Sequence, residues 1–215
     1  MKNFTISIAT LQSEWDSLLQ EFQANSEISR QVFQDLVTAY SSADRFYHTL
    51  GHIQQVLEKL EPMRSLALEF PIIQLAAWFH DVIYHPKSND NEEKSADYAE
   101  VSLNSLNLPK STINRIKTLI LSTKTHQASP DDIDCQIILD ADLAILGASE
   151  VDYRAYAQAI RQEYAWVSDE RYRVQRKQVL QNLLQRERIY FTELLFLKLE
   201  EKARWNIQGE IEPIN

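Results

Sequence analysis

A few histidines and aspartates that stand in apolar segments are the residues of this chain best suited to chemistry. His80 and Asp81 lie within the apolar run 72–84, so both side chains are expected among residues that favour the interior. Burying an unpaired carboxylate costs several kcal/mol. A metal ion, a buried arginine or a cap at a helix end would each offset that cost, so the pair alone leaves metal and structural interpretations open.

Asp142 is a second acidic residue in an apolar setting. On a helix, the residues three and four positions away from it are all apolar: Ile138, Leu139, Ile145 and Leu146. An acid on such a face is rarely tolerated unless it is paired or bound to a metal. Asp140 lies about 200° away around the same helix, so the two aspartates cannot point directly into one site. We prefer Asp142 as a ligand, with Asp140 as the alternative.

The histidines are few and clustered. The chain has five: His48, His52, His80, His85 and His126. Imidazole and carboxylate groups suit Mn²⁺, Fe²⁺, Co²⁺, Ni²⁺ or Zn²⁺. His48 and His52 stand one helical turn apart and could chelate an ion together. We prefer His52, which has apolar neighbours, as the direct ligand and expect His48 to support it from behind.

The elements that must position these groups are expected to be helices. The 215 residues include only three glycines and six prolines, while Leu, Gln, Glu, Ala and Lys recur at spacings of three and four. We expect an all-α, single-domain bundle over residues 1–215, because this length suits one domain. The metal site falls within residues 48–142, and helices within 150–207 complete the bundle. Helices are expected at 11–23, 28–40, 49–60, 71–84, from 90 or 91 onward, and at 109–123, 133–146, 150–167, 169–186 and 189–207, with Gly147 stopping the helix before it.

Charge and composition narrow the classes of partner. A net charge of −9 argues against an extended nucleic acid as ligand, because such binders present a basic face. The single cysteine, Cys135, excludes an internal disulfide. The start Met1 to Ser7 lacks a signal-peptide pattern, and no apolar run approaches the length of a membrane span. We therefore expect a cytoplasmic protein without a membrane partner, whose oligomeric state the sequence does not indicate.

Several motifs occur in an order that is typical of one superfamily. They are YHTLGHI at 47–53, HDVIY at 80–84, DNEEKSA at 90–96, LDADL at 139–143, AIRQEY at 159–164 and ARWN at 203–206. In this order they resemble the HD-domain superfamily of metal-dependent phosphohydrolases. More narrowly, they resemble a small bacterial branch of predicted phosphohydrolases of that type, over most of the chain.

The resemblance implies a helical bundle that holds one divalent ion (Mn, Fe, Co, Ni, Mg or Zn). Its ligands, carried over to this sequence, are His52, His80, Asp81 and Asp142. The implied activity is hydrolysis of a phosphate ester, with a nucleotide or related small phosphorylated metabolite as substrate. Binuclear members of the superfamily carry two further histidines before the last aspartate, and His85 follows His80 too closely to match one of them. We therefore expect a single ion.

Further roles follow from the implied reaction. A group near the ion would protonate the leaving oxygen, and the candidates are His126, Asp90 and Glu92. Cationic side chains would neutralise phosphate charge, and the candidates are Lys94, Lys124 and Arg161. The alternative function is a non-catalytic sensor or interaction module that binds a metal and a nucleotide. A closed structural metal site is a third possibility, which an open coordination position beside a pocket would exclude.

Overall fold

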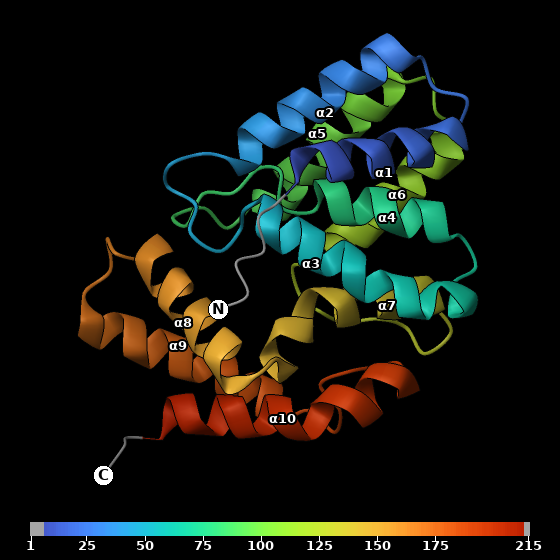
Figure 1. Cartoon of the computed structure of the whole chain (residues 1–215). Helices are drawn as coiled ribbons and strands as arrows, with labels where there is room; N and C mark the ends of the chain where they lie inside the picture. Colours follow the sequence, from blue (N-terminus) through green and yellow to red (C-terminus); the bar gives the residue numbers. More distant parts are fainter. Residues whose placement is uncertain (1–6, 213–215) are drawn as a thin grey trace.

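The chain is built from helices joined by short loops (Figure 1). The computed structural model describes residues 7–212, and no strand occurs among them, so the all-α prediction is confirmed. The α-helices are α1 (Ile8–Gln20), α2 (Ser26–Tyr40), α3 (Leu50–Leu60), α4 (Phe70–Phe79), α5 (Asn91–Ser105), α6 (Lys110–Ser122), α7 (Ile133–Leu143), α8 (Glu150–Glu163), α9 (Asp169–Leu184) and α10 (Glu193–Ile211), with 3₁₀ turns η1 (Glu61–Leu66) and η2 (Ala144–Gly147). No helix within 7–212 is long and apolar enough to cross a membrane. The expectation about the N-terminal segment falls on residues 1–6, outside the described part.

Polar residues fix where several of these helices begin. Each accepts a hydrogen bond from a backbone N–H of the first turn, which would otherwise lack a partner. These capping residues include Asn25, Thr49, Asp132, Ser149 and Thr192. Two of the caps bear on the predicted site, since Thr49 places His52 in the first turn of α3 and Asp132 starts the helix that carries Asp142.

The N-terminal half of the core is aromatic. Trp15 of α1 meets Trp78 of α4 edge to face, with ring centroids 5.5 Å apart, and Phe33 of α2 packs against both. The Trp15 indole also donates to the carbonyl and hydroxyl oxygens of Ser29. This cluster attaches the α1–α2 arm to α4, the helix that leads into His80 and Asp81.

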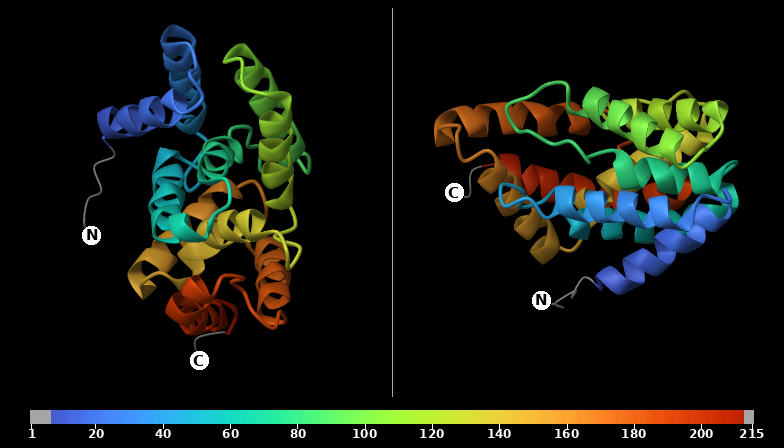
Figure 2. Two further views of the ribbon diagram at one scale, coloured as in Figure 1. Left: turned by 90° about the vertical axis from the view of Figure 1, so that its right-hand side faces the viewer. Right: turned by 90° about the horizontal axis from the view of Figure 1, so that it is seen from above.

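Three helices at the centre of the molecule, α3, α4 and α7, pack against one another in pairs. On one side α5 and α6 form a pair that packs on α4. At the other end η2 packs against α10 and α8, while α9 packs on α10. The left view of Figure 2 shows the two ends apart, with the blue α1–α2 pair at the top and the red α10 at the bottom. The central trio carries all four predicted metal ligands on or directly after its helices.

Helix α4 ends earlier than the sequence suggested. It stops at Phe79, and the expected continuation to Tyr84 is wrong. His80 still donates its backbone N–H to Ala76 O, but Val82 N bonds to Phe79 O, so the chain turns away there. His80 and Asp81 therefore occupy the turn at the helix end. Their side chains there approach His52 of α3 and Asp142 of α7.

Two other expectations need correction nearer the C-terminus. Gly147 does not end a helix in the left-handed conformation, because no glycine in the described residues has a positive φ. A Cβ at Gly147 would instead lie 2.6 Å from the Cβ of Leu199, so glycine is needed for close approach of η2 to α10. Helix α10 begins at Glu193 rather than at residue 189. The backbone N–H groups of 189–192 are bound by two carboxylates, Asp140 and Glu200, which hold this stretch out of a helix.

Candidate metal centre

His52, His80 and Asp81 bring three ligand atoms to one point. The Nε2 atoms of His52 and His80 are 3.1 Å apart, and Asp81 Oδ2 lies 3.0 Å from His80 Nε2 and 3.5 Å from His52 Nε2. All three ligand atoms fall within 4.8 Å of one another, and both imidazoles are buried. A buried His52–His80–Asp81 group that can hold a metal ion is thus present.

Asp142 approaches the same point from α7. Its Oδ1 lies 3.2 Å from His52 Nε2 and 3.6 Å from His80 Nε2. The structure therefore places the two imidazoles between two carboxylates, although α3, the α4 turn and α7 are far apart in sequence. Asp142 thus lies beside the two imidazoles, while the ligand atoms that all fall within 4.8 Å of one another are those of His52, His80 and Asp81.

The orientation of His80 suits a metal ligand. Its Nδ1 donates to Ala77 O at 2.9 Å, which leaves Nε2 with its lone pair directed at the centre. Arg45 fixes the turn that follows, because its guanidinium donates to the carbonyl oxygens of His48, Asp81 and Val82. Nothing in the sequence pattern singled out Arg45. Two of its three bonds go to backbone atoms more than 30 positions away along the chain.

The charges of the centre are strongly coupled. Burial disfavours an imidazolium, yet Asp81 and Asp142 raise the pKa of His80 well above its ordinary value. Burial likewise opposes ionisation of the two aspartates, but His80 and its neighbours hold the pKa of Asp81 well below its usual range. Hydrogen bonds from His126 and His52 do the same for the pKa of Asp142. Two carboxylates around two imidazoles thus demand positive charge, which either protons or a metal ion can supply.

The spacing of the donors fits a metal ion. Ligands at about 2.1 Å from an ion lie about 3.0 Å apart at octahedral and about 3.4 Å apart at tetrahedral angles. The observed separations between imidazole nitrogen and carboxylate oxygen at this centre run from 3.0 to 3.6 Å. Two neutral imidazoles and two carboxylates are also a donor set that suits Mn²⁺, Fe²⁺, Co²⁺, Ni²⁺ and Zn²⁺.

His48 borders the centre and is held by a carboxylate from α8. Its Nδ1 lies 2.7 Å from Glu163 Oε2, while its Nε2 is 4.0 Å from Asp81 Oδ2. Glu163 Oε1 accepts the backbone N–H groups of Phe46, Tyr47 and His48. Burial opposes the charge of Glu163, but these contacts, His48 first, lower its pKa to about 2. The carboxylate therefore stays ionised and directs the Nε2 of His48 towards the metal centre.

Tyr84 completes this arrangement. Its hydroxyl donates to Glu163 Oε2 at 3.0 Å, and its ring stacks on the His48 imidazole with centroids 4.0 Å apart. From the sequence we expected His48 to support His52 from behind, whereas in the structure His48 lies at the edge of the centre with its own carboxylate partner. Glu163 was missed because it stands in a polar helix far along the chain, although the AIRQEY motif contains it.

His126 reaches the centre from the loop after α6. Its Nε2 lies 2.8 Å from Asp142 Oδ2, the oxygen that does not face the other histidines. The residue has a φ of 49°, a left-handed conformation that costs a non-glycine residue energy. Arg186 holds it there by donating to the carbonyl oxygens of Thr125 and His126. Of the three residues expected to act as acids, His126 is thus the one beside the metal ligands.

Asp140 turns away from the metal centre. It is fully buried, and its oxygens accept the backbone N–H groups of Phe191 and Thr192 and the Thr192 hydroxyl. All of these donors belong to the segment that leads into α10. The alternative ligand of the sequence analysis therefore has a separate, structural set of partners.

The other predicted site residues have partners outside the centre. Asp90 bonds to Ser88 and pairs with Lys94 on the surface. Lys124 pairs with Glu93, and Arg161 pairs with Asp169 and donates to the carbonyl oxygens of Tyr164 and Val167. Glu92 is partly buried in the first turn of α5. Within residues 7–212, no hydrogen bond or ion pair joins Asp90, Glu92, Lys94, Lys124 or Arg161 to the four metal-centre residues.

The DNEEKSA motif has a positional role. Asn91 accepts the backbone N–H of His85 and donates to its carbonyl oxygen, while Ser95 makes the same double contact with Ile83. These two residues fix the loop that follows the His80–Asp81 turn. The motif therefore supports the centre through Asn91 and Ser95 and not through its acids.

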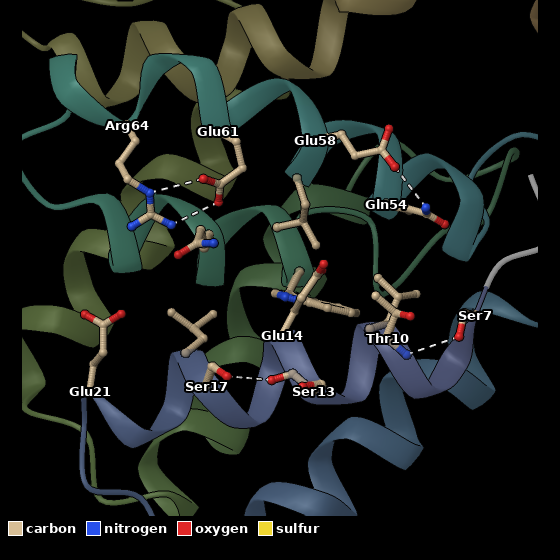
Figure 3. Close-up of a pocket in the computed structure, with 15 residues that line it drawn as sticks. Ser7, Thr10, Ser13, Glu14, Ser17, Glu21, Gln54, Glu58, Glu61 and Arg64 are labelled. Atoms are coloured by element: carbon tan, nitrogen blue, oxygen red, sulfur yellow. Dashed lines mark hydrogen bonds and ion pairs between the residues drawn. The ribbon is translucent and has the colours of Figure 1, made fainter.

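Two cavities lie near the central helices, and only one of them reaches the metal centre. A cavity of about 260 Å³ is lined by His52 and Asp142 together with residues of α3, η2 and α8. A larger hollow of about 550 Å³ between α1 and α3 holds Glu14, Glu58 and Glu61, the last of which pairs with Arg64 (Figure 3). None of the four metal-centre residues lines this larger hollow.

Comparisons of the chain with protein-family models, with curated proteins and with solved structures find no match.

Proposed function

We propose that this protein is a metal-dependent hydrolase that cleaves a phosphate ester of a small metabolite, in the manner of the HD-domain proteins that its motifs resemble. The observation that carries the proposal is the convergence of His52, His80 and Asp81, whose ligand atoms all lie within 4.8 Å of one another, with Asp142 Oδ1 3.2 Å from His52 Nε2 and a cavity beside it. A structural site would be closed on all sides by protein ligands. Here a cavity adjoins two of the four ligands, which favours a site that admits a substrate.

The four residues would hold one divalent ion. Such an ion supplies a Lewis acid that withdraws charge from a phosphoryl oxygen and acidifies water. The chain's own contribution is to fix the donors: Ala77 O orients His80, and Arg45 holds the turn that carries Asp81. Both supports act through buried or partly buried hydrogen bonds, so the ligand geometry is set before an ion binds.

Two histidines flank the ligands and are suited to proton transfer. The Nδ1 of His48 is hydrogen-bonded to Glu163, so its Nε2 is the nitrogen available to donate a proton to the leaving oxygen. His126 Nε2 is engaged by Asp142 and has no such free nitrogen on the metal side. We therefore propose His48 as the general acid and His126 as the residue that orients Asp142. Asp90 and Glu92 have no part in this scheme.

The proposal is tested by metal analysis and by turnover. Protein stripped of metal and reloaded with Mn²⁺, Co²⁺, Ni²⁺ or Mg²⁺ is expected to bind one ion per chain and to release phosphate from a panel of phosphate esters. His48→Gln should keep the ion but lower kcat about 100-fold or more, the effect typical of losing an acid–base group. His85→Gln changes an exposed histidine and serves as the matched control. Tight nucleotide binding without turnover of any ester would replace this function by the sensor alternative.

A further inference from the structure

The outer face of α10 carries two large apolar side chains that are open to solvent. Leu197 is 73% exposed and Trp205 is 72% exposed, and eight residues of helix place them about 80° apart, on the same side. Figure 1 shows α10 along the lower edge of the molecule, and the left view of Figure 2 shows no other helix beyond it. We propose that this face is the contact surface of a homodimer, in which two copies of the chain pair their α10 helices antiparallel about Glu201.

The neighbours of Trp205 in the ARWN motif have structural contacts that the tryptophan lacks. Ala203 is fully buried, Arg204 pairs with Glu200, and the Asn206 amide donates to backbone carbonyls beside η2. These contacts attach α10 to the bundle. Within residues 7–212, the Trp205 indole N–H has no hydrogen-bond partner and its ring packs on no other aromatic ring. Contacts inside the chain therefore do not explain a large apolar residue at this position.

The other strongly exposed apolar side chains form no comparable face. Among residues 7–212, Leu68 and Val101 are the other two that exceed 70% exposure, and they stand before α4 and on α5. Val174 and Val179 share α9, but five residues of helix place them about 140° apart. Single exposed apolar side chains are normal on a protein surface, whereas grouped ones mark contact sites. The pair on α10 is thus the group that calls for a partner.

The charged residues of the same face indicate that the partner is a second copy of the chain. Lys198, Glu201 and Lys202 are exposed, and none of them takes part in an ion pair within residues 7–212. Because the whole chain carries a net charge of −9, two copies repel each other least where acidic and basic side chains are mixed. A strongly charged partner, such as a nucleic acid or a basic peptide, gains little from a face of mixed sign.

The order of these residues along α10 is complementary to itself. Glu201 stands four residues from Leu197 and four from Trp205, so a two-fold axis beside Glu201 brings each Leu197 next to Trp205 of the second copy. Lys198 is three residues from Glu201. The two Glu201 carboxylates therefore share the space near the axis with two Lys198 ammonium groups, and each carboxylate can pair with the lysine of the other copy.

A groove between α10 and α8 extends the surface beyond Trp205. Its lining includes Arg154 and Ala157 of α8 and Gly209 of α10, where a Cβ would meet nothing within 4 Å. In the antiparallel pair, Leu194 of the second copy lies over this groove.

The dimensions of the face set the expected affinity. The 19 residues of α10 give a face about 28 Å long and about 10 Å wide. Stable interfaces bury about 800 Å² per partner, so even with the groove this face is at the small end of the range. We therefore expect a dimer that dissociates in the micromolar range.

Sedimentation velocity of the full chain over a micromolar concentration series tests the proposal. Monomer should convert to dimer as the concentration rises, and Leu197→Glu and Trp205→Glu should each weaken the dimer about 30-fold or more, the loss typical of a central interface residue. Val174→Glu changes a similarly exposed residue of α9 and is the matched control. Thermal unfolding checks that each variant folds. A monomer at every concentration, or a dimer that Leu197→Glu and Trp205→Glu leave unchanged, would overturn the proposal.

Charge reversal tests the antiparallel arrangement itself. Lys198→Glu gathers only carboxylates near the axis and Glu201→Lys gathers only ammonium groups, so each should weaken the dimer about tenfold or more. The double variant exchanges the two signs and keeps their balance, so it should associate about tenfold more tightly than either single variant. A double variant that associates no better than the single ones would overturn the pairing about Glu201.

Discussion

Two aspartates on α7 stand two residues apart and belong to different kinds of buried polar cluster. Asp140 accepts three hydrogen bonds from the segment that leads into α10, while Asp142 faces the imidazoles of His52, His80 and His126. Burial raises the pKa of Asp140 to about 6. In contrast, hydrogen bonds from His126 and His52 overcome burial and hold the pKa of Asp142 well below its usual range.

The difference separates a structural carboxylate from a candidate metal ligand. Backbone N–H groups cannot release their protons, so they satisfy Asp140 permanently and fix the chain that they belong to. Imidazole nitrogens can exchange a proton for a metal ion, so the partners of Asp142 allow a change of state. Glu200 is a second carboxylate of the structural kind, since it accepts the backbone N–H groups of Ile189 and Tyr190 and the Arg204 guanidinium.

The first expected effect distinguishes the two aspartates by their contribution to metal affinity. Asp142→Asn removes a charged ligand and should lower the affinity for a divalent ion about 100-fold or more, beyond the usual effect of losing a supporting residue. Asp140→Asn should change it less than tenfold. Competition titration with a chromogenic chelator measures both, and metal loss confined to Asp140→Asn would reverse the assignment.

For folding stability the order should be reversed, with the larger loss expected at Asp140. Asp140→Ala removes the acceptor of three donors, of which the two on Thr192 are buried, and at 1–3 kcal/mol for each buried donor this should lower the free energy of unfolding by about 4 kcal/mol. Urea denaturation in excess chelator measures the effect without a contribution from metal binding. Asp131→Ala, at an exposed position in the loop before α7, is the control. A loss below 1 kcal/mol for Asp140→Ala would show that solvent or other groups replace its carboxylate.

The sequence predicts much of the frame and part of the site. Helical periodicity predicted the helices, and apolar neighbours led to the choice of His52 and Asp142 as candidate ligands, because both patterns are local properties of the sequence. The position at which α4 ends does not depend on such a local pattern. The turn at His80 and Asp81 is stabilised by Arg45, Asn91 and Ser95, whose contacts come from other elements.

The AIRQEY motif shows why side-chain roles were harder to predict. Arg161 was expected to bind phosphate and Glu163 was overlooked, yet Glu163 holds His48 at the edge of the metal centre, whereas Arg161 pairs with Asp169 on the surface. Side chains two positions apart on a helix point about 200° away from each other, as those of Asp140 and Asp142 do. Charge alone suggested the arginine, while the partner of the glutamate is a loop more than a hundred residues earlier in the chain. Such a contact depends on tertiary packing and leaves no local signal.

A further expected effect concerns the pH dependence that Glu163 confers on folding. Its pKa falls from an ordinary 4.5 to about 2 in the folded chain, so its ionised form stabilises the fold above about pH 4.5 and this contribution disappears as the pH falls towards 2. The shift corresponds to about 3 kcal/mol at neutral pH.

The difference in unfolding free energy between wild type and Glu163→Gln should therefore shrink on acidification, whereas Glu187→Gln, at an exposed position, should differ little from wild type throughout. Urea titrations at a series of pH values, all in chelator, measure both differences. A gap between wild type and Glu163→Gln that stays constant from pH 7 to 3 would mean that the Glu163 carboxylate contributes through its shape and hydrogen-bond geometry and not through its charge.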